Sequence, residues 1–188
     1  DVESRGLGDV YKRQELDIRK GEVSGWRRTL HMDQGTVTRS FDWTSPAGRT
    51  VHVETVRLVS FGVKNLMAMS YEVTPVNFDG EITFLSVLDA NVENHTRKTN
   101  PLVDYGPFGR CLLTDRITAD ESMLFYQGTT EHSGLTMACG SVMTVRSPLT
   151  QEWSVTEDGL HCRHKIAVHG TKGQTITAEK QIAYTSSL

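Results

Sequence analysis

Polar and apolar residues alternate along most of the chain, which is the pattern of β-strands that bury one face. The clearest run places four apolar side chains at every second position before a proline ends it: Met67, Met69, Tyr71, Val73 and Pro75. No stretch shows the apolar stripe of an amphipathic helix. The pattern therefore predicts an all-β protein.

Two stretches depart from simple alternation. In the first, the apolar positions up to Val53 share one phase and those from Val56 onward share the other. A change of phase inside one strand indicates a β-bulge, which we expect near Glu54-Thr55. In the second, residues 81–89 carry apolar side chains in both phases, as strands covered on both faces do. We expect that strand to lie in the middle of a sheet.

Turn-forming residues separate the runs at short intervals. They occur at Ser45-Pro46-Ala47-Gly48, Asn77-Phe78-Asp79-Gly80, Glu157-Asp158-Gly159 and Thr171-Lys172-Gly173. Many short strands joined by tight turns favour antiparallel sheets over alternating strands and helices. The sequence predicts a large antiparallel β-sandwich.

A short repeat occurs near the start of the chain. Residues 16–23 recur fourteen positions later as residues 30–37, and each copy holds a polar pair, a glycine and a valine. Gly21 and Gly35 occupy the positions where a tight turn calls for a positive φ angle. We therefore expect two successive hairpin turns and a meander over residues 15–44.

Residues 92–111 interrupt the strand pattern with two prolines, two glycines and two aromatic residues. A loop of this length inside a compact domain is uncommon and is often functional. Its apolar side chains need cover from another domain, from a second subunit or from the edge of their own sandwich. We take it as a candidate interface formed by Asn100, Leu102, Asp104, Tyr105 and Phe108.

Composition narrows the classes of partner. A formal net charge of −3 gives no reason to expect nucleic acid or an anionic membrane. No run of apolar residues reaches the roughly 18 that a membrane helix needs. The three cysteines are far apart and odd in number, which favours reduced thiols and a cytoplasmic protein.

No set of residues predicts a catalytic centre, a metal site or a cofactor site. In His161-Cys162-Arg163-His164 a strand would place only Cys162 and His164 on one face, which is too few ligands for zinc. Glu131-His132-Ser133 lacks a nucleophile elbow and is expected to be a polar turn. Asp89, Glu93 and Asp104 lie near the long loop, but nothing in the sequence pairs two of them as acid and base.

The first fourteen residues follow neither a strand nor a helix pattern. Asp9-Val10-Tyr11-Lys12-Arg13-Gln14 resembles the in-frame translation of a transposon-end adaptor used in sequencing libraries. We interpret residues 1–14 as such a remnant, the alternative being an ordinary mobile terminus. The natural protein is then expected to continue upstream of Glu15.

Several stretches, taken in order, resemble the N-terminal domain of glycoside hydrolase family 65, which includes maltose, kojibiose and trehalose phosphorylases. The resemblance covers residues 15–188 and rests on residues 26–32 (Trp-Arg-Arg-Thr-Leu-His-Met), 35–41 (Gly-Thr-Val-Thr-Arg-Ser-Phe), 53–60 (Val-Glu-Thr-Val-Arg-Leu-Val-Ser), 69–77 (Met-Ser-Tyr-Glu-Val-Thr-Pro-Val-Asn) and 88–94 (Leu-Asp-Ala-Asn-Val-Glu-Asn). Residues 96–107 (Thr-Arg-Lys-Thr-Asn-Pro-Leu-Val-Asp-Tyr-Gly-Pro) look most similar to the maltose-phosphorylase branch.

The resemblance implies a galactose-mutarotase-like super-sandwich followed in the chain by an (α/α)6 barrel, before which residues 15–188 stop. In the family the barrel holds the catalytic acid and the phosphate site, so no catalytic residue carries over to this chain. The parent enzyme is expected to cleave an α-glucoside such as maltose with inversion, using inorganic phosphate as co-substrate and no cofactor. The domain itself is expected to support the barrel and a homodimer.

Two other functions compete with this interpretation. A free-standing carbohydrate-binding module would stack exposed aromatics on sugar, with Trp26, Trp43 and Trp153 as candidates, although we expect at least two of them to be buried. A small mutarotase-like enzyme would need a histidine and a glutamate in one cleft, and the spacing of Glu131, His132 and His164 does not support it.

Overall fold

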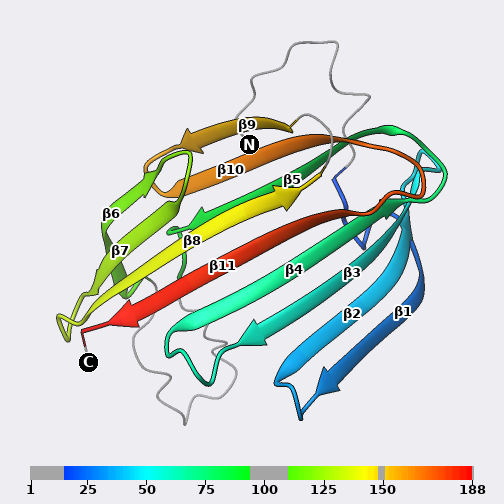
Figure 1. Ribbon diagram of the computed structural model, residues 1–188. Coiled ribbons are helices and arrows are strands. Elements are labelled where there is room, and N and C mark those ends of the chain that lie inside the picture. Colours follow the sequence, from blue (N-terminus) through cyan, green and yellow to red (C-terminus); the bar gives the residue numbers. More distant parts are fainter. Residues whose placement is uncertain (1–14, 94–109, 148–150, 188) are drawn as a thin grey trace, which may run out of the picture.

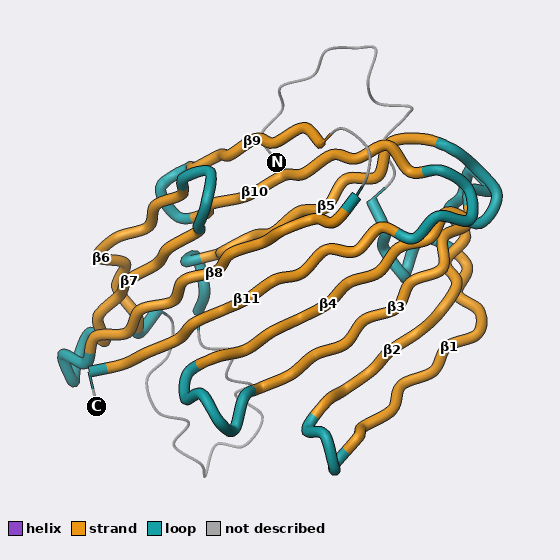
Figure 2. The backbone as a smooth tube through the Cα atoms, viewed as in Figure 1, coloured by secondary structure: helices purple, strands orange, loops and turns teal. Residues whose placement is uncertain are grey.

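The computed structural model describes residues 15–93, 110–147 and 151–187. Within these ranges the regular structure consists of eleven β-strands in two sheets, and every paired neighbour is antiparallel (Figures 1 and 2). No helix in the described ranges could cross a membrane. The predicted all-β antiparallel sandwich is confirmed.

The larger sheet has eight strands and includes both ends of the described chain. In spatial order they are β1 (Glu22–His31), β2 (Thr36–Thr44), β3 (Thr50–Val59), β4 (Leu66–Pro75), β11 (Ile176–Ser186), β8 (Thr136–Arg146), β7 (Leu124–Thr130) and β6 (Leu112–Ala119). The last strand in sequence, β11, therefore lies in the middle of the sheet and joins its two halves (Figure 1).

The smaller sheet has three strands, in the order β5 (Gly80–Asp89), β10 (His161–Gly170) and β9 (Gln151–Glu157). Its strands approach β6 and β7 most closely. Three strands cannot cover eight, so the inner face of the larger sheet is only partly covered over β1 to β4.

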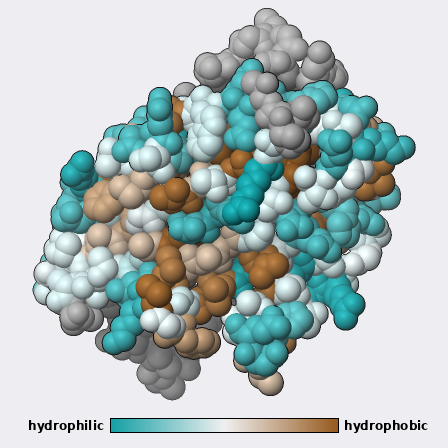
Figure 3. Space-filling model, in the orientation of Figure 1, coloured by the Kyte–Doolittle hydropathy of each residue, from teal (hydrophilic) through white to brown (hydrophobic). Residues whose placement is uncertain are grey.

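The core lies between the inward faces of the two sheets. Alternate residues of β2, β3, β4, β5, β8, β10 and β11 supply it, as half-buried sheets require. It consists of Phe41, Trp43, Val51, Val53, Val73, Phe84, Met143, Val145, Ile166, Val168, Ile176 and Ala178. Figure 3 shows apolar side chains gathered near the middle of the visible face, with polar ones around them. The predicted strand that ends at Pro75 is confirmed as β4.

The bulge expected near Glu54-Thr55 is wrong. Strand β3 pairs with β2 and with β4 without any shift of register. Thr55 is 3% exposed and continues the buried face of Val53, whereas Val56 is 39% exposed. A polar residue at an inward position, followed by apolar ones at outward positions, imitates a change of phase.

A bulge occurs instead in β1, where the register with β2 shifts between Ser24 and Arg27. Gly25 has a φ of 62°, which a glycine adopts without strain and which is the usual conformation at the first position of such a bulge. The extra residue turns Trp26 toward Phe41, and their ring centroids lie 5.2 Å apart.

The strand over residues 81–89 forms as expected, but its predicted place in the middle of a sheet is wrong. It is β5, an edge strand of the smaller sheet, and β10 takes the middle position. Phe84 and Ser86 point inward and are buried, while Leu85 and Val87 are 56% and 40% exposed. Its apolar outer face therefore has no cover in the described part of the chain.

The repeat produces one hairpin and not two, so the predicted meander over residues 15–44 is half wrong. The second copy turns at residues 32–35 between β1 and β2, with Gly35 at a φ of 66°. The first copy forms a turn that leads into β1, in which Lys20 N donates to Asp17 O (2.9 Å), and the described residues before it, from Glu15 on, hold no strand. Gly21 is needed for space: a Cβ there would lie 2.5 Å from Thr44 O.

Candidate functional site

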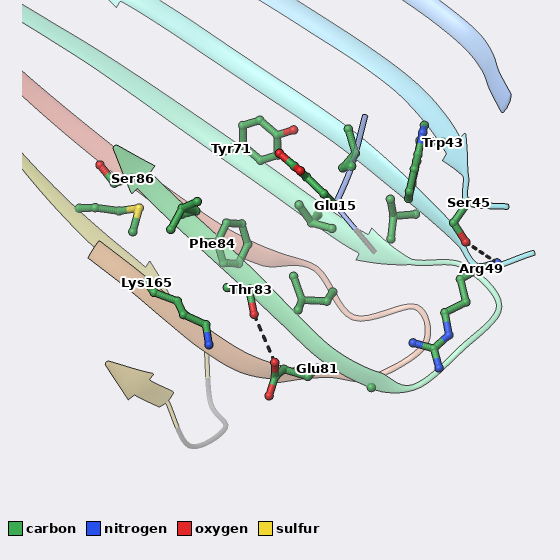
Figure 4. A pocket seen from close by; sticks show the side chains of 18 of the residues that line it. Glu15, Trp43, Ser45, Arg49, Tyr71, Glu81, Thr83, Phe84, Ser86 and Lys165 are labelled. Carbon is green, nitrogen blue, oxygen red and sulfur yellow. Dashed lines mark hydrogen bonds between the residues drawn. The ribbon is translucent and has the colours of Figure 1, made fainter. Parts of the chain in front are cut away.

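A groove of about 1020 Å³ lies between the two sheets. It opens where the smaller sheet ends at β5 and the inner face of the larger sheet continues. Figure 4 shows side chains from β2, β4 and β5 lining it, among them Trp43, Tyr71 and Phe84. The mismatch in sheet width therefore creates a concave surface large enough for a small molecule or a protein segment.

The walls of the groove are mainly apolar and partly fixed by hydrogen bonds. Trp43 is 5% exposed, and its indole nitrogen donates to Asp17 O at 3.1 Å. The Asp17 carboxylate accepts hydrogen bonds from Arg19, which lowers the pKa of Asp17 to about 2. This entry segment holds the Trp43 ring in place at one end of the groove. Met143 and Val73 extend the apolar wall along β8 and β4.

A few charged groups line the groove as well. Burial lowers the pKa of Lys180 on β11, and burial also raises the pKa of Tyr71 on the neighbouring strand. Glu81 accepts a hydrogen bond from Thr83 at 3.3 Å near the start of β5. Arg49 lies over the ring of Phe78 at 5.3 Å. The groove thus combines apolar walls with separated polar groups, which is the make-up of a binding surface.

The groove does not contain the parts needed to cleave a glycosidic bond. Such cleavage uses two carboxyl groups, one of which stays protonated because it is buried or lies beside another negative charge. In the described ranges no Asp or Glu is fully buried, and both carboxylates of the groove, Glu15 and Glu81, are exposed. Within the described ranges the groove therefore offers a surface for binding or docking.

The histidine and cysteine cluster on β10 divides between two faces, as the strand pattern predicts. Cys162 and His164 are fully buried, whereas His161 lies nearer the surface and contacts Asp158 at 2.8 Å and Asp89 at 3.2 Å. His164 contacts Asp120 O through Nε2 at 2.5 Å. Within the described ranges no group of three or more possible ligands is placed to hold a metal ion.

The other candidates do not converge on a reaction centre. Glu131 and His132 lie in a turn, with side chains 51% and 78% exposed and 3.9 Å between Oε2 and Nε2. Their surroundings also differ from those of His164, because His164 is fully buried and both of these side chains are exposed. Glu93 is exposed, and Asp104 lies outside the described residues. The predicted interface residues also lie outside the described residues: Asn100, Leu102, Asp104, Tyr105 and Phe108.

The expectation that at least two tryptophans are buried is wrong. Only Trp43 is buried, while Trp26 and Trp153 are 48% and 42% exposed. Trp153 lies at the edge of the smaller sheet, with its ring centroid 6.3 Å from that of His164. Both exposed rings lie on edge strands, β1 and β9, where the opposite sheet does not fully cover the inward face.

Sequence reasoning missed the groove and the cations of the open inner face. The signal was present in the alternation, because Arg39 stands between Val37 and Phe41 in the inward phase of its strand. A cation at an inward position is expensive unless the face is open or a counter-charge covers it. That pattern could have shown that this face is not an ordinary core.

Comparison with known proteins agrees with the fold. The sequence profile of "Glycosyl hydrolase family 65, N-terminal domain" matches residues 9–188. The chain belongs to glycosyl hydrolase family 65, as its N-terminal domain. The match begins inside the segment that we interpret as an adaptor remnant.

Relatives with established names are phosphorylases. The chain is 30% identical to an α,α-trehalose phosphorylase of Thermoanaerobacter brockii over 93% of its length, and 25% identical to a kojibiose phosphorylase of Halothermothrix orenii over 43%. It spans 22% of the first of these proteins and 10% of the second. The chain therefore covers about a fifth or less of these curated family 65 relatives.

A solved structure shows the same fold. The putative kojibiose phosphorylase from human microbiome superposes with a TM-score of 0.74 at 13% identity, over 93% of this chain and 21% of that one. At this identity the likeness supports the fold alone. It confirms the predicted sandwich of the family 65 N-terminal domain.

Proposed function

We propose that this domain is the non-catalytic N-terminal part of an inverting disaccharide phosphorylase that acts on an α-glucoside such as maltose. The observation that carries the proposal is the family 65 N-terminal match over residues 9–188, on a sandwich whose groove lacks a buried carboxylic acid. The named relatives, which phosphorolyse trehalose and kojibiose by their names, support the reaction class.

In the parent enzyme a carboxylic acid of the barrel would protonate the leaving oxygen while inorganic phosphate attacks the opposite face of the glucose carbon. The C–O bond to the leaving sugar breaks as the C–O bond to phosphate forms, so an α-glucoside yields β-glucose 1-phosphate. Phosphate serves as co-substrate, and this chemistry calls for no cofactor. Residues of this domain take no part in the bond changes.

The domain's own role in the proposal is to support the barrel and a homodimer. The exposed apolar pair Leu85 and Val87 on β5 gives the smaller sheet an outer surface that another domain would cover. Residues 100–108 remain the proposed dimer or domain contact. The free thiols of Cys139 and Cys162 support a cytoplasmic enzyme.

The experiment is to recover the gene sequence on both sides of this segment and to assay the whole protein with phosphate and a panel of maltose, trehalose and kojibiose. The proposal expects a helical-barrel sequence after Leu188 and β-glucose 1-phosphate as the product by proton NMR. The likeness of residues 96–107 to maltose phosphorylases favours maltose in the panel. An α-anomeric product, or a stop codon directly after Leu188, would contradict it.

A carbohydrate-binding module is the second candidate, and the half-exposed rings of Trp26 and Trp153 favour it. It predicts millimolar binding of maltose by the 188-residue chain in isothermal titration, abolished by Trp26→Ala or Trp153→Ala. Absence of maltose binding together with activity of the whole protein favours the phosphorylase domain.

A further inference from the structure

Three arginines stand together on the open inner face of the larger sheet. Arg28 on β1 pairs directly with Arg39 on β2, and Arg39 pairs with Thr55 on β3. Arg57 lies two residues beyond Thr55 and so faces the same side. Side chains at such direct and diagonal positions start within about 5–8 Å of one another. Together with Val37 they enclose a cavity of about 80 Å³.

No carboxylate balances these charges in the described part of the chain. None of the three arginines forms an ion pair there, and like charges directly opposite each other, such as Arg28 and Arg39, destabilise a sheet. The nearest acidic residues of β2 and β3, Asp42 and Glu54, alternate onto the opposite face, where both contact His52. The inward positions of β2, β3 and β4 hold no Asp or Glu.

Aromatic side chains border the arginines and hold one of them in place. The Arg39 guanidinium lies 5.0 Å from the ring centroid of Trp26, which is half-exposed and which the Gly25 bulge turns toward this face. Stacking leaves the N–H fork of an arginine free to bind and reduces the entropy lost when it does so. Tyr71 completes the border, and the charges of Arg39 and Arg57 reach its hydroxyl.

We propose that this cavity is an oxyanion site that binds a phosphate group, either free or carried by a sugar. By the same measure one water needs about 10–15 Å³, so the cavity has room for a small tetrahedral anion. Planar guanidinium groups match phosphate oxygens in pairs of hydrogen bonds. The exposed face of Trp26 beside the cavity gives an attached sugar ring a surface on which to stack.

The inference goes beyond the proposed function and does not depend on it, because it uses only residues of β1 to β4. Carboxylates of another protein segment would satisfy the same arginines. The observations favour phosphate because the charges converge on one small cavity instead of lining a strip along a strand.

The test titrates the 188-residue chain with inorganic phosphate and with glucose 1-phosphate, at low ionic strength, by calorimetry and tryptophan fluorescence. Arg39→Ala and Arg57→Ala should each weaken phosphate binding about tenfold or more, the usual loss for a hydrogen bond to a charged group. The matched control is Arg27→Ala, which removes the same charge from the adjacent residue on the opposite face. It should change the dissociation constant less than twofold.

Two further measurements separate the outcomes. Trp26→Ala should weaken glucose 1-phosphate more than inorganic phosphate if a sugar phosphate is the ligand, and both equally if phosphate alone is bound. Phosphate should also raise the urea midpoint of the wild type more than that of Arg39→Ala, whose own cooperative unfolding transition shows that the variant is folded. Lack of binding by the wild type, or an equal loss in Arg27→Ala, would overturn the proposal.

Discussion

Gly21 gives the sharpest test of how the entry segment closes one end of the groove. In Gly21→Ala the new Cβ would lie 2.5 Å from Thr44 O and 2.5 Å from the indole nitrogen of Trp43. One of these is backbone of β2, and the other belongs to a ring that is 5% exposed and donates to Asp17 O. Neither neighbour can move without breaking a contact of the core.

Overpacking of this kind costs about 1–3 kcal/mol in free energy of unfolding. With a urea m-value of about 2 kcal/mol/M, the midpoint should fall by about 0.5–1.5 M, with no change in m. The assay is urea unfolding followed by far-UV circular dichroism and by tryptophan fluorescence, to which the buried Trp43 contributes together with the exposed Trp26 and Trp153. The fluorescence of the folded variant should also shift, since its indole has to leave its present position.

The matched control is Gly62→Ala. Gly62 also lacks a positive φ, and a Cβ there meets nothing within 4 Å. That variant should be as stable as the wild type or more stable by up to about 1 kcal/mol, through the reduced freedom of its unfolded chain. A midpoint for Gly21→Ala at or above that of Gly62→Ala would refute the packing described here.

Three more predictions follow from burial and charge. Leu124→Ala empties a fully buried position and should cost about 2–5 kcal/mol in urea unfolding, so a loss below 1 kcal/mol would show that the site is not packed. The hydrogen bond with Asp42 raises the pKa of His52. In urea unfolding, His52→Gln should therefore lose most free energy of unfolding below pH 6.5, and its difference from the wild type should fade as the pH rises through the raised pKa. A difference that grows with pH would contradict this assignment. Cys162 is buried, and burial also raises the pKa of its thiol. A thiol reagent should therefore label Cys162 only on unfolding, and after the less buried Cys139. Early labelling of Cys162 in the native protein would contradict its place in the core.

The elements could be predicted because alternation reports the strand period directly. Strand β4 ends at Pro75 as expected, and the hairpin at Gly35 follows from its turn residues. The errors arose where the polarity of a residue did not match its burial in the structure. Thr55 is polar yet buried, which imitated a bulge. The real bulge at Gly25, across which the inward positions pass from Val23 to Trp26, was not recognised in the sequence.

The place of a strand within a sheet could not be predicted from its own composition. Strand β5 is apolar on both faces, but it is an edge strand whose outer residues are exposed in the described structure. The groove escaped prediction for a related reason, since it results from the unequal widths of two sheets and not from any single motif. The arginine cavity could not be predicted without the register of strand pairing, which brings together Arg28, Arg39 and Arg57 from three strands.

The central proposal is that this family 65 N-terminal domain takes no part in cleaving the glycosidic bond. The most direct measurement compares the 188-residue chain with the whole protein for release of glucose 1-phosphate from phosphate and maltose, trehalose or kojibiose. The account predicts product only from the whole protein, because the described chain has no fully buried carboxylic acid. Phosphate-dependent turnover by the 188-residue chain alone would contradict it.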